Sequence, residues 1–142
     1  MSNIGLLGAG MTMAIAAIGS ALGISIAGRA AIGAWKRNFM ANKPASFTLV
    51  VFAGAPITQI FYGYILTTQS MIKSAKDPLF VLAVGIAGGI AIAMSALAQG
   101  QAGASASDAM GETGKGFGLY IMVVGLCETV ALFVMALAMT ML

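Results

Sequence analysis

The chain alternates long apolar stretches with short polar segments. Three stretches contain no charged residue and a fourth contains only one, and they cover residues 4–28, 45–72, 78–107 and 116–142. Each exceeds the about 20 residues that a helix needs to cross the hydrocarbon core of a bilayer. The pattern predicts an all-α membrane protein with four transmembrane helices. An even number of spans places both termini on one side of the membrane.

The composition supports this prediction and excludes several function classes. The 142 residues include only seven Lys or Arg and four Asp or Glu, and 60% of them are apolar. So few charges cannot cover the surface of a small water-soluble domain. With no His and one Cys, the chain offers neither a zinc site nor a Cys–His nucleophile. The net charge of +3 is too small and too scattered for nucleic-acid binding, so the bilayer is the first expected partner.

The positions of the basic residues predict the orientation. The first and third predicted loops carry five basic residues, the second carries two, and the termini carry none. The five are Arg29, Lys36, Arg37, Lys43 and Lys115, and the two are Lys73 and Lys76. Because basic loops stay in the cytoplasm, we expect the first and third loops there and both termini outside.

The two halves of the chain are related by an internal repeat. At an offset of 75 residues, positions 15–28 align with positions 90–103, and seven of the 14 pairs are identical. The matches include Ser20-Ala21-Leu22 with Ser95-Ala96-Leu97. The repeat predicts two helical hairpins, residues 1–74 and 75–142, the second of which carries the acidic residue described below. At an offset of 69 residues, Gln59 in the second span faces Glu128 in the fourth.

The spans also differ in bulk. The first holds six Gly and no aromatic residue and the third holds five Gly, whereas the second and fourth carry most of the aromatic residues. Small residues at four-residue spacing let membrane helices approach closely. Two arrangements fit this pattern: a compact four-helix bundle, or an oligomeric ring with the thin spans on the inner circle and the thick spans outside.

Glu128 lies close to the middle of the fourth span. A charged group at that depth costs about 2.5 to 3.5 kcal/mol on insertion scales, and such groups mark ion or proton pathways. Lys and Arg are confined to the predicted loops, so none lies at a depth that would pair with Glu128. We therefore expect a proton, a bound cation or a group from another chain to neutralise this carboxylate.

The other membrane-depth polar residues bear on which of these it is. Ala55, Thr58, Gln59 and Tyr62 are spaced to share one helical face, and Gln99 lies at about the depth of Glu128. Their oxygen atoms suit a hard alkali cation, whereas a proton needs only the carboxylate. The alternative role for the neutral residues is hydrogen bonding between helices, worth about 0.6 kcal/mol on average.

Pro56 falls inside this polar segment of the second span. Proline has no backbone N–H and its ring clashes with the preceding helical turn. We therefore expect a kink at Pro56 that leaves the carbonyl of Phe52 without its usual helical partner.

Three short motifs carry a resemblance to a known family. They are Pro56-Ile57-Thr58-Gln59 followed by Tyr62-Gly63, then Ala98-Gln99-Gly100, and Glu128-Thr129. Together they resemble the proteolipid of V-type rotary ATPases, above all subunit K, the duplicated ring subunit of bacterial sodium-pumping forms. The resemblance covers the whole chain, including the amide at Gln59 in place of a second carboxylate.

The resemblance implies a non-catalytic subunit that forms a homo-oligomeric ring in a prokaryotic cell membrane. Such a ring turns against a stationary membrane subunit that supplies an arginine, while a central stalk on the cytoplasmic loops links it to subunits that hydrolyse or make ATP. It also implies that Glu128 is the ion-carrying carboxylate and that Na⁺ is the cargo. The other implied ligands are Gln99, Thr58, Gln59 and the backbone carbonyl of Ala55, with Tyr62 as the hydroxyl that holds Glu128 in the closed site.

Three alternatives to a sodium-carrying rotor remain open. The first is the same rotor carrying H⁺. The second is a small four-helix secondary transporter, but those carry their essential glutamate in the first span, which has none here. The third is a structural or channel-forming bundle, which leaves Glu128 unexplained. The dipeptide Gly114-Lys115 lacks the rest of a phosphate-binding loop, so we expect no ATP site.

Overall fold

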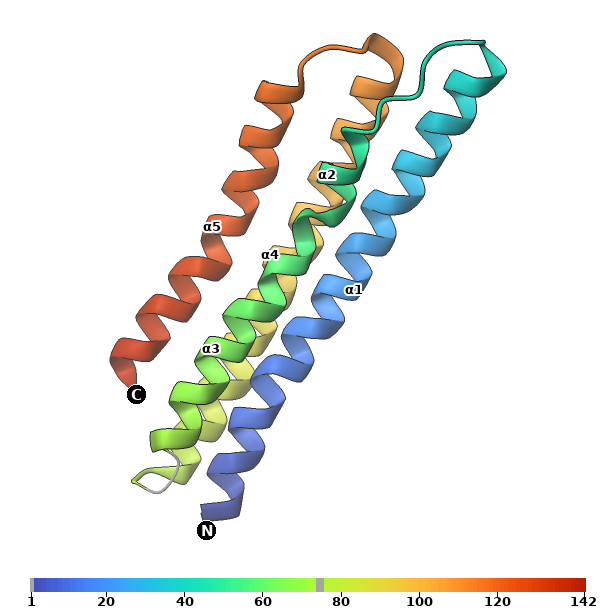
Figure 1. Ribbon diagram of the computed structural model, residues 1–142. Helices are drawn as coiled ribbons and strands as arrows, with labels where there is room; N and C mark the ends of the chain where they lie inside the picture. Colours follow the sequence, from blue (N-terminus) through green and yellow to red (C-terminus); the bar gives the residue numbers. More distant parts are fainter. Residues whose placement is uncertain (1, 74–75) are drawn as a thin grey trace.

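The computed structural model describes residues 2–73 and 76–142, and throughout this part of the chain every regular element is helical. The elements are α1 (Ser2–Met40), α2 (Leu49–Gly54), the 3-10 turn η1 (Ala55–Ile57), α3 (Thr58–Lys73), α4 (Pro78–Thr113) and α5 (Phe117–Met141) (Figure 1). Because α2, η1 and α3 follow one another without a loop, they form one interrupted span. The four resulting spans are each long and apolar enough to cross a membrane, which confirms the predicted all-α, multi-pass fold.

Two spans are longer than predicted. α1 and α4 have 39 and 36 residues, or about 58 and 54 Å at 1.5 Å per residue, well beyond the about 30 Å hydrocarbon core. The prediction that Arg29, Lys36 and Arg37 lie in a loop is therefore wrong, because all three lie on α1. Arg and Lys are good helix formers, so the first charge marks where α1 can leave the membrane and not where the helix ends.

The connections between the helices follow from local backbone chemistry. Asn42 adopts a left-handed conformation just after α1, as do Gly114 and Gly116 between α4 and α5. At the start of α4, the Asp77 side chain accepts a hydrogen bond from the Phe80 N–H at 3.1 Å, next to Pro78 in the first turn. Both termini lie toward the end of the molecule that carries the α3–α4 connection (Figure 1). The predicted boundary between the two hairpins, at residues 74 and 75, lies outside the described residues.

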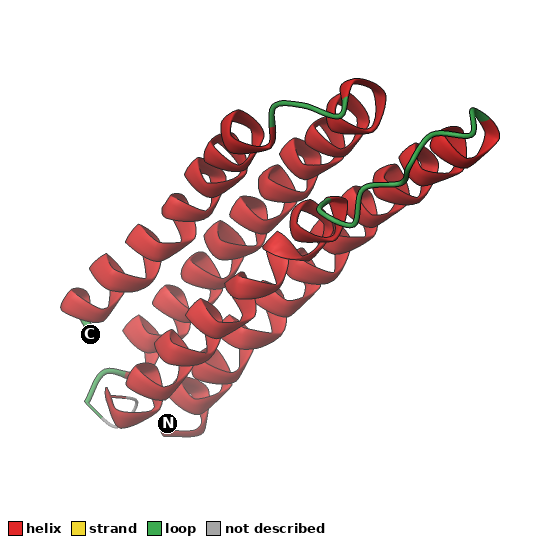
Figure 2. Cartoon of the chain, turned by 45° about the horizontal axis from the view of Figure 1, so that its top comes forward, coloured by secondary structure: helices red, strands yellow, loops and turns green. Residues whose placement is uncertain are grey.

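Small residues bring α1 and α4 into close contact. Side by side, these helices form the most extensive helix pair, with α5 on the other side of α4 (Figure 1; Figure 2). At Gly19 an added Cβ would lie 2.6 Å from the Cβ of Ala93, and the backbones of Gly23 and Gly100 are in direct contact. The two glycine-rich spans therefore pack against each other, while α3 and α5 lie against them and against one another.

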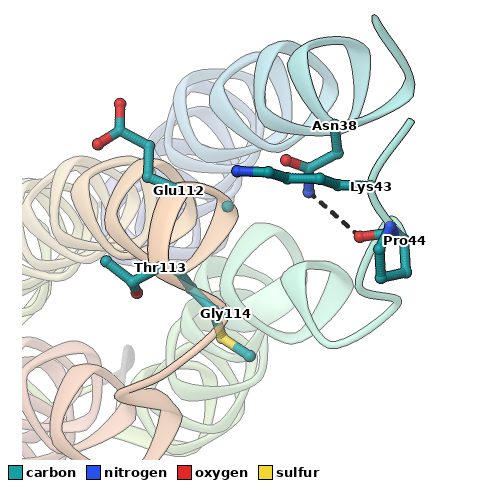
Figure 3. A pocket seen from close by; sticks show the side chains of 8 residues that line it. Asn38, Lys43, Pro44, Glu112, Thr113 and Gly114 are labelled. Atoms are coloured by element: carbon teal, nitrogen blue, oxygen red, sulfur yellow. Dashed lines mark hydrogen bonds between the residues drawn. The ribbon is translucent and has the colours of Figure 1, made fainter. Parts of the chain in front are cut away.

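The end of the molecule opposite the termini carries an open pocket of about 280 Å³ between the last turns of α1 and α4 (Figure 3). Its lining includes the charged side chains of Lys43 and Glu112. Asn38 donates a hydrogen bond across it to the carbonyl of Pro44 at 3.5 Å. This pocket lies in the extramembrane extensions of the helices, at the end that carries the first and third loops.

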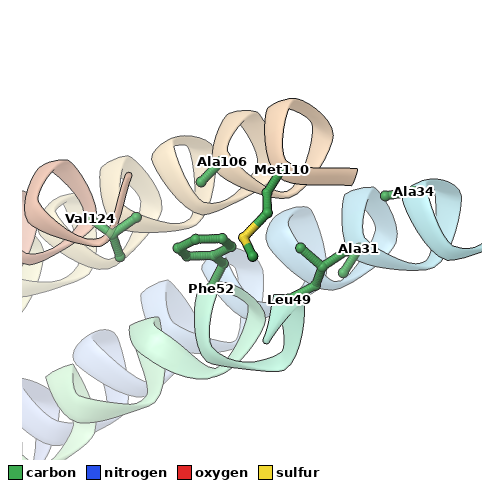
Figure 4. Close-up of a cluster of buried hydrophobic side chains, with 7 residues drawn as sticks. All are labelled: Ala31, Ala34, Leu49, Phe52, Ala106, Met110 and Val124. Atoms are coloured by element: carbon green, nitrogen blue, oxygen red, sulfur yellow. The ribbon is translucent and has the colours of Figure 1, made fainter. Parts of the chain in front are cut away.

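Two apolar clusters fill the interior. The first lies in the half of the molecule nearer these loops and contains Ala31, Ala34, Leu49, Phe52, Ala106, Met110 and Val124 (Figure 4). The second contains Ala16, Leu66, Ile92, Ala131 and Ala138. Along each helix, a layer of buried polar side chains, among them Gln59 and Gln99, lies between the two clusters. The fold therefore places its membrane-depth polar groups between two apolar layers.

Candidate ion-binding site

Glu128 lies near the middle of α5, 11 residues after its first residue and 13 before its last. Its two carboxylate oxygens have separate partners from two other helices. Tyr62 of α3 donates its hydroxyl to Oε1 at 2.6 Å, and Gln99 of α4 donates its Nε2 to Oε2 at 3.2 Å. The structure thus brings together three residues that are at least 29 positions apart in sequence.

The amide of Gln99 is the centre of the site. Besides Glu128, its Nε2 donates to the carbonyl of Val124 at 3.2 Å, and its Oε1 accepts a hydrogen bond from Gln59 Nε2 at 2.7 Å. The Gln59 and Gln99 side chains are both fully buried. Because both N–H groups of Gln99 and one lone pair of its oxygen are occupied, the orientation of this amide is determined by its surroundings.

Three oxygen atoms meet on the other side of Gln59. The Thr58 hydroxyl lies 2.8 Å from Gln59 Oε1 and 3.1 Å from the Ala55 carbonyl oxygen. A hydroxyl has one proton, so it cannot donate fully to both acceptors at once. This leaves an excess of acceptor oxygens in a half-buried position, which is an arrangement that favours a positively charged ligand.

Pro56 shapes this oxygen cluster, as the sequence predicted. The span changes from α-helix to a 3-10 turn at Ala55–Ile57, with the Thr58 N–H donating to the Ala55 carbonyl. The Phe52 carbonyl, which the missing proline N–H leaves without its helical partner, lies against Gly103, where an added Cβ would be 2.7 Å from that oxygen. Glycine at position 103 therefore gives α4 room beside the kinked span.

No basic side chain compensates Glu128 in residues 2–73 and 76–142. The ion pair recorded in this part of the chain joins Arg37 and Asp108, which are both about half exposed and lie on the helix extensions. The same residues contain no group of three or more His, Cys, Asp or Glu side chains able to hold a metal. Any cation at Glu128 would therefore be held by one carboxylate and neutral oxygens.

The sequence analysis missed Ser95. Its hydroxyl donates to the carbonyl of Cys127 at 2.6 Å, directly before Glu128, and Ser95 is only 4% exposed. Two sequence features pointed to it: it lies one helical turn before Gln99, and it belongs to the repeated Ser-Ala-Leu block. Cys127 contributes its backbone to this contact.

Comparison with known proteins gives two matches. Residues 82–141, which include Gln99 and Glu128, match the sequence model of the ATP synthase C-subunit family. The chain is also 31% identical, over 141 residues, to the A-type ATP synthase subunit K of Methanocaldococcus jannaschii. This alignment covers 98% of the chain but 61% of the relative, so the chain spans about three-fifths of the relative's length. Together with the four apolar helices, these matches confirm the predicted family: the chain belongs to the rotary ATPase proteolipids.

Proposed function

We propose that the chain is a rotor-ring subunit of an A- or V-type ATP synthase and that it carries Na⁺ at Glu128. The observation that carries this proposal is the hydrogen-bonded site at mid-span: a carboxylate bound by Tyr62 and Gln99, with no basic partner in the described residues. ATP would be hydrolysed or made by other subunits, so the chain itself would be non-catalytic.

The direction of the hydrogen bonds favours a cation over a proton as cargo. Tyr62 and Gln99 both donate to Glu128, which suits an ionised carboxylate because only the ionised form accepts at both oxygens without donating. An ionised carboxylate in lipid needs a counter-charge. The acceptor oxygens of Thr58, Gln59 and Ala55 complete a ligand set that a hard cation uses and a proton does not.

The internal repeat supports a ring of identical subunits. Within the chain, Gly8 packs on Leu82, Gly19 on Ala93, and Gly23 on Gly100. Adding 75 to each α1 position and subtracting 75 from each α4 position gives the pairs expected between neighbouring copies: Ala83 with Leu7, Met94 with Ile18, and Ala98 with Ser25. All six of these residues are exposed in the single chain. Each copy therefore presents two different faces that repeat its internal contact, and a head-to-tail interface of this kind closes into a ring.

Disulfide cross-linking tests this interface. Ser25→Cys with Ala98→Cys, in a Cys127→Ala background, should give a ladder of oligomers, because the equivalent internal contact joins the backbones of Gly23 and Gly100. The control combines Ser25→Cys with Phe133→Cys, an exposed position on α5, and should give no ladder. A chain that stays monomeric with both pairs would contradict the ring.

The proposed cycle uses the closed and open forms of the Glu128 site. While the site faces lipid it is closed by Tyr62 and loaded with Na⁺, so it is nearly neutral and can cross the hydrocarbon. At the stationary subunit, an arginine from that partner favours the empty, ionised carboxylate, and the ion leaves through one half-channel before another refills the site. One elementary charge is worth about 2.3 kcal/mol per 100 mV. A single carboxylate per four helices moves few ions per turn, which favours pumping over synthesis.

The proposal also places the chain in its membrane. The first and third loops, with the pocket that Lys43 and Glu112 line, would face the cytoplasm and contact the central stalk. Both termini would lie outside, in a prokaryotic cell membrane. Three basic residues on the α1 extension, Arg29, Lys36 and Arg37, agree with this orientation because they share the end of the molecule that carries Lys43 and Lys115.

Labelling with a hydrophobic carbodiimide, which attacks protonated buried carboxyls, tests the proposal. Glu128 should be labelled, and Na⁺ should protect it. Glu128→Gln should abolish labelling and transport by the reconstituted complex while the ring still assembles, and Glu112→Gln, an exposed acid on α4, should change neither. Labelling that ignores Na⁺ at every pH would instead indicate a proton-carrying ring. Retained transport in Glu128→Gln would contradict the mechanism altogether.

A further inference from the structure

We infer that Ser95 is a positioning residue for Glu128, because it holds the segment of α5 that carries the carboxylate. The Ser95 hydroxyl donates to the Cys127 carbonyl at 2.6 Å, one residue before Glu128, and Ser95 is almost completely buried. The inference rests on the proposed role of Glu128 as the ion-carrying group, and it adds a residue that makes no hydrogen bond to Glu128 itself.

Ser95 and Gln99 hold α5 at two points. The two residues are one helical turn apart on α4, and their acceptors, the carbonyls of Cys127 and Val124, are about one turn apart on α5. A helical carbonyl already accepts one bond from within its own helix, and it retains a second lone pair for a side chain. Two such bonds restrict rotation of α5 about its own axis, and that rotation would swing Glu128 away from Tyr62 and Gln59.

The repeat provides an internal comparison. Ser20 of α1 aligns with Ser95, and it is also fully buried. Within the described residues, however, the Ser20 hydroxyl makes no hydrogen bond. The span that faces Ser20 contains the break at Pro56, which packs against Gly23 one turn further along α1. The same residue at the same repeat position is therefore hydrogen bonded in the hairpin that carries the carboxylate and unbonded in the other.

This difference separates a positioning role from a packing role. If Ser95 were present only because a small residue fits between helices, Ser20 and Ser95 would tolerate alanine equally well. If Ser95 orients Glu128, only its replacement should weaken the ion site. Ser20→Ala is thus a matched control, since it removes a buried hydroxyl from the equivalent position without removing a hydrogen bond.

The test measures the Na⁺ concentration that half-protects Glu128 from carbodiimide in the purified oligomer. Ser95→Ala should raise this concentration about 2- to 12-fold, the equivalent of one lost hydrogen bond. Ser20→Ala should leave it unchanged, and Ser95→Thr, which keeps the hydroxyl, should restore it toward the wild-type value. Ser95→Cys keeps the size of the side chain but donates weakly, and it should shift the concentration in the same direction even if Ser95→Ala does not assemble.

Two results would overturn the inference: wild-type protection in both Ser95→Ala and Ser95→Cys, or an equal shift in Ser20→Ala. Failure of the proposed cargo has a different signature, because wild-type labelling would then ignore Na⁺. In that case the pH midpoint of Glu128 labelling becomes the readout. Ser95→Ala must then differ from wild type and Ser20→Ala must not, and any other pattern contradicts a positioning role.

Discussion

Replacing Tyr62 with Phe removes one oxygen atom from the site and leaves the aromatic ring in place. That oxygen donates a hydrogen bond to Glu128 Oε1 at 2.6 Å. A hydrogen bond to a charged group contributes about 1.5 to 3 kcal/mol, and we take about 1 to 2 kcal/mol here because Tyr62 is only partly buried. Tyr62→Phe should therefore weaken Na⁺ binding about 5- to 30-fold. Glu128 would keep its bond from Gln99.

The assay is Na⁺ protection of Glu128 from carbodiimide, titrated at constant pH. Tyr64→Phe is the control, because Tyr64 lies two residues further along α3, is 54% exposed, and makes no hydrogen bond within the described residues. It should behave as wild type. The reasoning is refuted if Tyr62→Phe is protected at the wild-type Na⁺ concentration, or if both tyrosine variants lose protection equally.

Three further changes test other parts of the structure. Gln99→Leu leaves the buried Gln59 amide without its acceptor, at a cost of about 1 to 3 kcal/mol, and should both lower thermal stability and abolish Na⁺ protection, unlike Gln101→Leu on the exposed face of α4. Pro56→Ala should restore a continuous helix and raise the melting temperature, yet weaken Na⁺ protection by moving the Ala55 carbonyl; unchanged protection would show that the kink is not needed. Gly23→Ala should destabilise the oligomer by about 1 to 3 kcal/mol in thermal unfolding because its Cβ would overlap the Ala96 carbonyl, whereas Gly33→Ala, with open space around it, should be neutral or stabilising.

The sequence predicted the four spans because lipid imposes a simple constraint on a chain. Every backbone polar group must be satisfied within the membrane, so long apolar stretches become helices. The same constraint does not apply beyond the membrane surface. There Arg29 and Arg37 continue α1, and Asp108 and Glu112 continue α4, because charged side chains do not interrupt a helix in water. The limits of the helices therefore could not be obtained from the limits of the apolar stretches.

The grouping of the site residues was also predictable. Depth in the membrane follows from the distance along a span, and facing follows from helical spacing, so Thr58, Gln59 and Gln99 were expected near Glu128. The hydrogen-bond pattern was not predictable at that level. The bond between Gln59 and Gln99, at 2.7 Å, depends on the relative rotation of α3 and α4, which small residues along α1 and α4 help to determine.

Ser95 was missed for a different reason. Its acceptor is a backbone carbonyl on another helix, and every residue carries such a carbonyl, so the pair has no sequence signature. Ser20 has the same sequence context and no bond, which shows that the repeat alone cannot distinguish the two residues. Only the three-dimensional arrangement of α4 against α5 does so.

Equilibrium binding of radioactive Na⁺ to the purified oligomer tests the central claim most directly. The account predicts one Na⁺ per chain, bound in competition with protons and lost in Glu128→Gln, because each chain has a single carboxylate with its own oxygen ligands at membrane depth. A wild-type oligomer that binds no Na⁺, although carbodiimide still labels its Glu128, would contradict the claim.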